Sequence, residues 1–470
     1  MPRDNTPKPK NPNQSSFDSL PPILAQNMTA KNCLEILKES RWNNDYQTEI
    51  FKQFLEADSI NNIVYSDYRC SIAKSLVIRY VLPDFIKSKG LSIDKIIAVE
   101  NDGECAASYS NIETATDKKE SRLIYGNYFV SNGTQKYIIH NEEGYQNDPK
   151  FKIASKKDTN PDANKFMEEL LKYAEEHNFL KGKKIDPKCI FVKFEKSYTW
   201  DDVILPDSIK EDIRVNILNL INSRDIYKKN GLQVKRGLIL ASAPGTGKST
   251  IFKVLCNTVD WTVLWVTPRH LESARHAAQI IELCKELSPT ILLLEDLDIY
   301  GASREINHNP AMLAEIMNQL DGVQENTDII TIASTNNKDV LEKALLDRPG
   351  RFDKVIDIPL PEYNERLQML KVFSNGLVDE KLSFLDQVAK EYSKKLTGAQ
   401  IRELVNMSII YAIDEKSYDE NQKITLKESH FSKAISNIKN KDFSKITGFS
   451  PTGASSPLNR LDYNCPDFDD

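Results

Sequence analysis

Residues 237–254 read GLILASAPGTGKSTIFKV, and they are the strongest indication of fold in the C-terminal half of the chain. An apolar run leads into a loop with two glycines, and a helix-forming run that begins with a lysine and a hydroxyl residue follows. Such glycines let backbone N–H groups wrap around phosphates, and the helix N-terminus adds partial positive charge. The stretch therefore predicts a P-loop, in which the following residues bind the nucleotide: Pro244, Gly245, Thr246, Gly247, Lys248, Ser249 and Thr250.

Two side chains of this loop have specific predicted roles. Lys248 supplies a positive charge to the β- and γ-phosphates, and the hydroxyl of Ser249 is a ligand for Mg²⁺. Ser242 stands at the first position of the motif, where Gly is usual. That residue begins the turn rather than surrounding the phosphates, so the motif tolerates the change.

A second apolar run, residues 291–294, ends in the acid pair Glu295-Asp296. A strand beside a P-loop can direct carboxylates at Mg²⁺ and at the attacking water. Strand-like runs alternate with helical patterns throughout this region, which indicates a parallel sheet covered by helices. The expected strands are residues 237–241, 262–266, 290–294, 328–333 and 354–358.

Further motifs resemble those of the AAA ATPases. Residues 331–353, TIASTNNKDVLEKALLDRPGRFD, resemble the second region of homology of that family, and residues 397–400, TGAQ, resemble the Gly-Ala motif of its helical lid. Residues 200–203, WDDV, resemble the start of its ATPase module. The resemblance covers residues 196–440. It implies an α/β P-loop domain over 196–360, with a parallel sheet between helices, and a small helical lid over 361–440.

The resemblance also implies residue roles. Asn336 matches sensor 1, which orients the attacking water, and Arg348 and Arg351 match the arginine fingers that reach a neighbouring subunit. Gly398 and Ala399 match lid residues that contact the nucleotide. The family therefore implies ATP and Mg²⁺ as cofactors, Mg²⁺-dependent ATP hydrolysis, and a homo-oligomer, by default a hexameric ring.

The acid pair departs from the usual order of the family. Most members have Asp before Glu. In this chain Glu295 stands at the position of the acid on the Mg²⁺ side, and Asp296 stands at the position of the acid that polarises the water. Asp is one methylene shorter, so hydrolysis is expected to be slower unless the water lies closer. The mitochondrial AAA translocases that move the folded Rieske iron–sulfur protein have a similar acid order.

The sequence also differs from the pattern of the family in the region expected to line the pore. Residues 266–271, VTPRHL, lack the aromatic tooth of protein-threading motors, as the same translocases do. Residues 299–310, which include Arg304, are expected to form a second loop facing the pore.

The N-terminal half carries no recognised motif. Prolines in residues 1–28 predict a disordered arm, and residues 441–470 predict a disordered acidic tail. Residues 29–195 predict an α+β domain with helices near 30–40, 46–57 and 68–88, a hairpin at Asn132-Gly133 and a helix opened by Pro161-Asp162.

The composition of the chain further narrows the class of protein. The formal net charge is −6, no apolar run approaches the roughly 18–20 residues of a membrane span, and the seven cysteines are scattered without a CxxC pair. A soluble cytoplasmic protein with free thiols is expected. No His-Glu-x-x-His motif is present, which excludes the zinc protease of membrane AAA enzymes.

Three functions remain open on sequence. The first is an ATP-driven remodeller whose protein substrate or partner is recruited by residues 29–195. The second is a nucleotide-gated scaffold with slow or no hydrolysis, suggested by the acid order. The third is a nucleic-acid-acting ATPase, suggested by Tyr125, Tyr128, Phe129 and Tyr137, although the acidic net charge argues against it.

Overall fold

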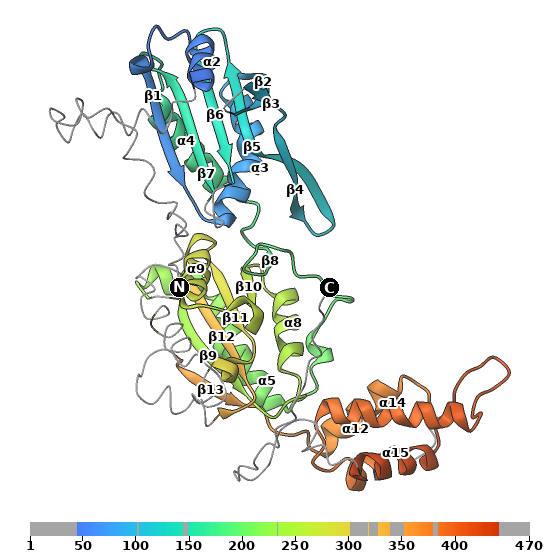
Figure 1. Cartoon of the computed structure of the whole chain (residues 1–470). Helices are drawn as coiled ribbons and strands as arrows, with labels where there is room; N and C mark the ends of the chain where they lie inside the picture. The colour runs from blue at the N-terminus through green and yellow to red at the C-terminus, as the bar shows by residue number, and fades with distance from the viewer. Residues whose placement is uncertain are drawn as a thin grey trace, which may run out of the picture. The chain divides into compact units, whose positions relative to one another are not determined.

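A computed structural model describes residues 45–100, 103–143, 149–232, 234–300, 318, 328–338, 352–378 and 384–440. The N-terminal arm, the helix expected near 30–40 and the C-terminal tail lie outside these residues. The chain divides into two compact units, Met1–Leu180 and Lys181–Asp470. Each unit has a sheet of its own (Figure 1).

Within its described residues, the N-terminal unit contains a seven-stranded antiparallel sheet. The strands follow the order β1-β7-β6-β5-β2-β3, and β4 pairs with the first half of the long strand β5. Their bounds are β1 Ile63–Arg69, β2 Ser92–Glu100, β3 Gly103–Cys105, β4 Ser108–Ala115, β5 Lys118–Ser131, β6 Lys136–Glu142 and β7 Lys150–Lys156.

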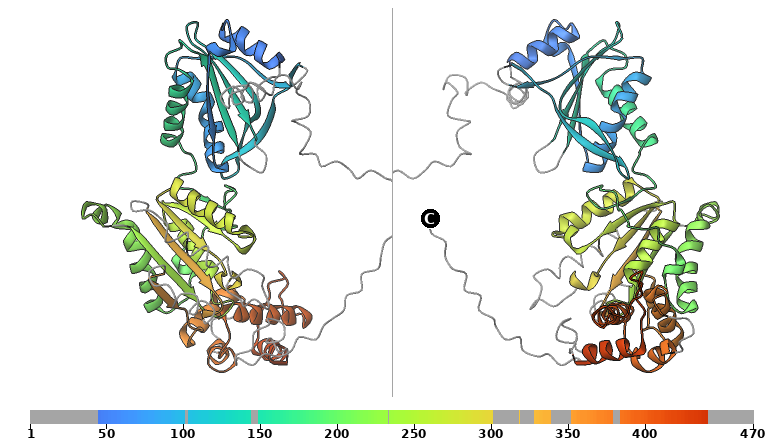
Figure 2. Two further views of the ribbon diagram at one scale, coloured as in Figure 1. Left: turned by 60° about the vertical axis from the view of Figure 1, so that its left-hand side comes forward. Right: turned by 90° about the vertical axis from the view of Figure 1, so that its right-hand side faces the viewer.

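Helices cover both faces of this sheet (Figure 2). Helices α3 (Ile72–Ser88) and α4 (Ala163–Glu176) pack on one face, and α2 (Asp45–Leu55) packs on the other. Successive strand residues point to opposite faces. Tyr137 accordingly stacks on Phe166 of α4, with ring centroids 4.1 Å apart, while the adjacent Ile138 joins Phe51 of α2 in a second core.

Local signals in this unit are confirmed with small shifts in bounds. The segment 132–135 joins β5 to β6 as a hairpin, with Gly133 at φ 86°. The Asp162 carboxylate accepts the N–H of Lys165 and begins α4. The helix expected from residue 68 begins only at Ile72, because the Ser71 hydroxyl caps it and residues 68–69 complete β1.

The aromatic residues behind the nucleic-acid hypothesis belong mostly to the core. Tyr128, Phe129 and Tyr137 are buried. Burial raises the pKa of the Tyr128 and Tyr137 hydroxyls to about 12. Rings packed against helices in this way are not available to stack on bases, so the structure removes the main reason for that hypothesis.

The second unit contains a six-stranded sheet, in its described residues, with the order β13-β9-β12-β11-β10-β8 and every pair parallel. The five strands expected from sequence are confirmed. Their bounds are β9 Lys235–Ala241, β10 Thr262–Val266, β11 Thr290–Leu294, β12 Ile329–Thr335 and β13 Lys354–Asp357.

The sixth strand, β8 (Lys184–Ile185), was missed, and it moves the boundary between the units. It pairs with β10, and the Lys184 ammonium donates to the carbonyl oxygens of Val259 (2.6 Å) and Trp261 (2.8 Å). The expected boundary at residue 195 was therefore too late. Residues 181–195 belong with the six-stranded sheet because these contacts connect them to β10.

Helices flank the sheet as expected. The first begins after Pro206 and consists of α5 (Asp207–Ile213), a turn of π-helix (Arg214–Leu218) and α6 (Asn219–Asn222). Glu211 of α5 pairs with Arg214 at 2.5 Å.

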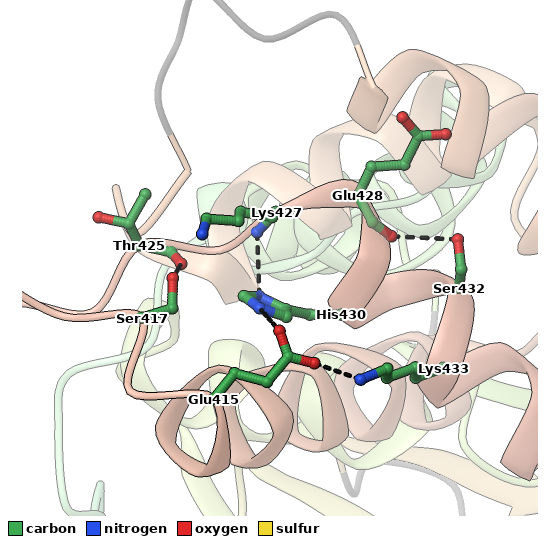
Figure 3. Close-up of polar contacts among 8 residues, drawn as sticks. All are labelled: Glu415, Ser417, Thr425, Lys427, Glu428, His430, Ser432 and Lys433. Carbon is green, nitrogen blue, oxygen red and sulfur yellow. Dashed lines mark hydrogen bonds and ion pairs between the residues drawn. The ribbon is translucent and has the colours of Figure 1, made fainter.

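The lid is helical, with α12 Tyr363–Ser374, α13 Phe384–Gln387, α14 Gly398–Asp414 and α15 Glu428–Asn440. Thr397 and Gln400 form a reciprocal capping box at the start of α14. The end of α14 is connected to the start of α15 by the buried His430 and by Glu415 (Figure 3). In the described part of the chain, no helix is long and apolar enough to cross a bilayer.

Candidate nucleotide site

The P-loop connects β9 to helix α8 (Lys248–Thr258) at the carboxyl edge of the parallel sheet. Gly245 (φ 80°) and Gly247 (φ 105°) adopt left-handed backbone conformations that Gly reaches at little cost. A Cβ on Gly245 would lie 2.6 Å from the Cβ of Ala399, so no side chain fits there. The glycine thus allows both the turn and the close approach of the lid.

Lys248 is held inside the site rather than exposed to solvent, with 7% of its surface accessible. Its ammonium donates to Oγ of Ser242 (2.9 Å), to the Ser242 carbonyl (3.1 Å) and to Oδ1 of Asn336 (2.8 Å). Burial lowers the pKa of Lys248 to about 8, while the carboxylates of Asp296 and Asp298 act in the opposite direction. A buried ammonium of this kind is well suited to a strongly anionic partner such as a phosphate.

The acid pair lies at the end of β11, and its two members are placed differently. The N–H of Glu295 donates to the Val266 carbonyl at 2.9 Å, which continues the ladder with β10. Asp296 has φ 48°, and its N–H donates to Oγ of Ser334 at 3.1 Å. Asp296 lines the nucleotide pocket, whereas Glu295 is not among the described residues that line it.

Asn336 follows β12 and connects the P-loop to the acid pair. Its Oδ1 accepts from Lys248, and its Nδ2 donates to Oδ1 of Asp296 at 3.0 Å. These partners fix the orientation of the amide, because an ammonium can only donate and a carboxylate only accepts. The side chains of Lys248, Asn336 and Asp296 therefore form one hydrogen-bonded polar chain within the site.

Asp298 was missed by the sequence analysis. It lies in a short 3-10 helix, Leu297–Tyr300, directly after the acid pair. Its Oδ1 accepts from the Thr335 hydroxyl (3.0 Å) and from the Asn336 N–H (2.9 Å). The available signal was a third acid two residues beyond Asp296, but sequence spacing could not reveal its partners on β12.

These elements enclose a pocket of about 690 Å³, within the usual range of small-molecule sites. The predicted site residues that line it are Pro244, Gly245, Thr246, Gly247, Lys248, Ser249, Thr250, Asp296, Asn336, Gly398 and Ala399. Arg348, Arg351 and Arg304 lie outside the described residues, so their positions stay predictions.

The apolar residues that line the pocket were also missed. It is lined by Val203, Ile204 and Leu205 before α5 and by Met369 and Phe373 from α12 of the lid. The guanidinium of Arg402 lies over the Phe373 ring, 4.7 Å from its centroid. The pocket thus combines apolar lining residues with a phosphate-binding loop, a combination that suits a nucleoside phosphate.

The site contains few acidic ligands for a metal ion. No group of three or more His, Cys, Asp or Glu side chains is placed to hold a metal within the described ranges. A magnesium ion bound with a nucleotide needs only one or two protein ligands, because phosphate oxygens and water supply the rest. The Ser249 hydroxyl at the start of α8 and the acids after β11 fit this mode of binding.

The parallel sheet, the P-loop and the polar chain behind it define a P-loop nucleotide-binding protein. Residues 238–360 match the family model described as the ATPase family associated with various cellular activities (AAA). The chain therefore carries an AAA ATPase domain, in agreement with the resemblance inferred from its motifs.

Similar curated proteins include proteasome-activating nucleotidases of archaea. The protein from Thermococcus kodakarensis is 30% identical over 237 residues, which cover 47% of this chain and 58% of the relative. The protein from Methanoregula boonei is 32% identical over 227 residues, which cover 46% and 50%. The chain thus spans 50% to 58% of the length of these two relatives. Neither match tests the likeness to the mitochondrial translocases, which stays a prediction.

Proposed function

We propose that the second unit binds ATP with Mg²⁺ and hydrolyses it, and that the chain uses this cycle to remodel a protein. The single observation that carries the proposal is the polar chain Lys248–Asn336–Asp296 at the P-loop, in a pocket that also has apolar lining residues. A positive charge, a carboxylate and an orienting amide are the groups that phosphoryl transfer requires around the γ-phosphate.

Each residue of the polar chain has a proposed role. Lys248 binds the β- and γ-phosphates, and Asp296 accepts hydrogen bonding from the attacking water because its carboxylate lines the pocket. Asn336 orients that water and keeps the Asp296 carboxylate in place. Ser249 and Glu295 are the residues that would hold Mg²⁺, which would neutralise charge on the transferred phosphoryl group. Gly398 and Ala399 close the lid side of the site.

We further propose that the chain acts as a ring, by default a hexamer, in which Arg348 and Arg351 reach the site of the neighbouring subunit. The motif that contains them supports this role, and a guanidinium suits a phosphoryl transition state better than an ammonium. The similarity of this chain to proteasome-activating nucleotidases supports the proposal that its substrate is a protein. The N-terminal unit is proposed to recruit that substrate or a partner, and the cytoplasm is the proposed location.

The test is Mg²⁺-dependent ATP hydrolysis across a range of protein concentrations, with Lys248→Ala, Asp296→Asn and Arg351→Ala beside the parent chain. Specific activity should rise with concentration, and each substitution should abolish it. Turnover that is independent of concentration and survives Arg351→Ala would contradict the ring.

The acid order supports a second candidate, a nucleotide-gated scaffold, because Asp296 is shorter than the usual Glu. This candidate predicts saturable ATP binding without turnover at any concentration. Asp296→Glu distinguishes the two: an increase in turnover indicates an active site limited by reach, whereas continued lack of turnover favours the scaffold.

A further inference from the structure

The carboxylate of Asp298 contacts the end of β12 at two adjacent residues. Its Oδ1 accepts from the backbone N–H of Asn336 at 2.9 Å and from the hydroxyl of Thr335 at 3.0 Å, whose single proton is shared with the Asn337 carbonyl at 3.1 Å. Both hydrogen bonds involve a charged acceptor, and such bonds are shorter and stronger than those between neutral groups. Asp298 thus holds the backbone at the point where Asn336 leaves the strand.

The same end of β12 is also connected to the P-loop. The Thr335 carbonyl accepts the N–H of Ser242 at 3.2 Å, and Ser242 in turn accepts from Lys248 through its hydroxyl and its carbonyl. Thr335 itself is fully buried. Residues 335–336 are therefore held from two sides, by the P-loop and by Asp298.

The side chain of Asn336 depends on this anchored backbone. It bridges the Lys248 ammonium and the Asp296 carboxylate, with both contacts at 3.0 Å or less. A small shift of the Asn336 backbone would break one contact or the other, because an Asn side chain has only two rotatable bonds. The geometry of all three polar groups therefore depends on the position of residue 336.

We propose that Asp298 is a positioning residue for ATP hydrolysis, acting through Asn336 rather than by touching the nucleotide. The proposal rests on the hydrolytic function proposed above. Asp298 is not among the described residues that line the pocket, which fits an indirect role. Its two acceptor contacts determine where the Asn336 amide lies, and that amide determines where Asp296 presents its carboxylate.

Two substitutions of Asp298 distinguish a positioning effect of its side chain from an effect of its negative charge. Asp298→Asn keeps an oxygen that can accept both hydrogen bonds but removes the negative charge, whereas Asp298→Ala removes both. If Asp298 positions Asn336, Asp298→Ala should lower kcat by roughly tenfold to a hundredfold. This factor corresponds to the free energy of one hydrogen bond to a charged group. KM should change by less than about threefold, and Asp298→Asn should restore most of the rate.

A double-mutant cycle with Asn336→Ala supplies the readout that a purely structural role would not change. If Asp298 acts through Asn336, adding Asp298→Ala to Asn336→Ala should cause little further loss of kcat. A general loss of folding would instead add to the effect of Asn336→Ala. Asp225→Ala removes an exposed carboxylate elsewhere in the same unit and serves as the matched control.

Hydrogen exchange of the peptide covering residues 334–337, measured by mass spectrometry on the full chain, tests the contact without turnover. Exchange of the Asn336 amide should be faster in Asp298→Ala, near the parent value in Asp298→Asn, and unchanged in Asp225→Ala. Unchanged exchange in Asp298→Ala, or additive effects in the cycle, would overturn the proposal. A parent chain that binds ATP without hydrolysis would instead count against the proposed function, and the exchange result would still decide the contact.

Discussion

The backbone N–H of Ala399, in the second residue of lid helix α14, donates a hydrogen bond of 2.9 Å to the carbonyl oxygen of Gly245 in the P-loop. The two residues are far apart in sequence, and this bond joins the lid directly to the loop that surrounds the phosphates. Any rearrangement of the P-loop on nucleotide binding must therefore be accompanied by the lid or break this bond. The contact gives a physical route from the nucleotide to the position of the lid.

Gly245→Ala should weaken ATP binding by at least about tenfold. The new methyl group would lie 2.6 Å from the Cβ of Ala399, and φ 80° is strained for a residue with a side chain. Titration with a fluorescent ATP analogue measures the change in Kd. Adding Ala399→Gly removes the 2.6 Å clash but leaves the backbone strain and a 3.1 Å approach to Oγ1 of Thr397, so it should recover part of the affinity. If the double variant recovers nothing, the close approach is not the cause.

ATP affinity should fall as pH rises above about 8. Lys248 binds phosphate as an ammonium, and burial lowers its pKa to about 8 in the protein. Above that pH the side chain must take up a proton on binding, which weakens the apparent Kd by up to about tenfold per pH unit. Titrations between pH 7 and pH 10 measure this slope. Lys248→Met should bind weakly at every pH, with the slope lost.

The same lysine should make stability depend on pH in the opposite direction. The pKa of Lys248 is about 8 when folded and 10.5 for a free side chain, so the unfolded chain binds more protons between these values. The free energy of unfolding should therefore rise with pH across this window, relative to Lys248→Met. Denaturant titrations of both proteins at several pH values give this difference. A difference that falls from pH 8 to pH 10 would contradict the depressed pKa.

Removing the His430 side chain should loosen the lid. His430 is fully buried; its Nδ1 accepts the Lys427 N–H at 3.1 Å and its Nε2 donates to Glu415 at 3.1 Å, while Lys433 pairs with the other Glu415 oxygen (Figure 3). His430→Ala loses both bonds and leaves a cavity, which should cost about 2–4 kcal/mol.

Hydrogen exchange of α15 peptides measures this loss locally, which suits a chain with two units. His430→Asn keeps an acceptor near the Nδ1 position and should restore part of the protection. Equal protection in the parent chain and in His430→Ala would show that these contacts do not hold the lid.

A fragment that begins at residue 181 should be more stable than one that begins at residue 196. The longer fragment keeps β8 on the edge of β10 and keeps the Lys184 contacts with Val259 and Trp261. Loss of β8 exposes the β10 edge, which favours aggregation. Thermal unfolding and light scattering of both fragments, each ending at residue 440, test the boundary. If the two fragments have equal melting temperatures and equal solubility, the result would support a boundary at residue 195.

Much of the second unit was predictable because its signals are local. The apolar run, the two glycines and the Lys-Ser pair near residue 248 specify a strand, a tight turn and a helix start without reference to the rest of the chain. The five strands were found for the same reason, since each is a short apolar run with turn residues on both sides. The strand β8 was missed because only two residues pair and no pattern distinguishes them.

The P-loop, the helical lid motif and the acid pair Glu295-Asp296 could be found from the sequence, because each is a property of neighbouring residues. The three-dimensional arrangement was needed to show that Asp296 rather than Glu295 lines the pocket, that Asp298 holds the end of β12, and that Gly245 approaches Ala399. These facts depend on which strands lie side by side and on how closely the lid approaches. Burial and hydrogen bonding between distant segments set them, and sequence spacing does not encode those distances.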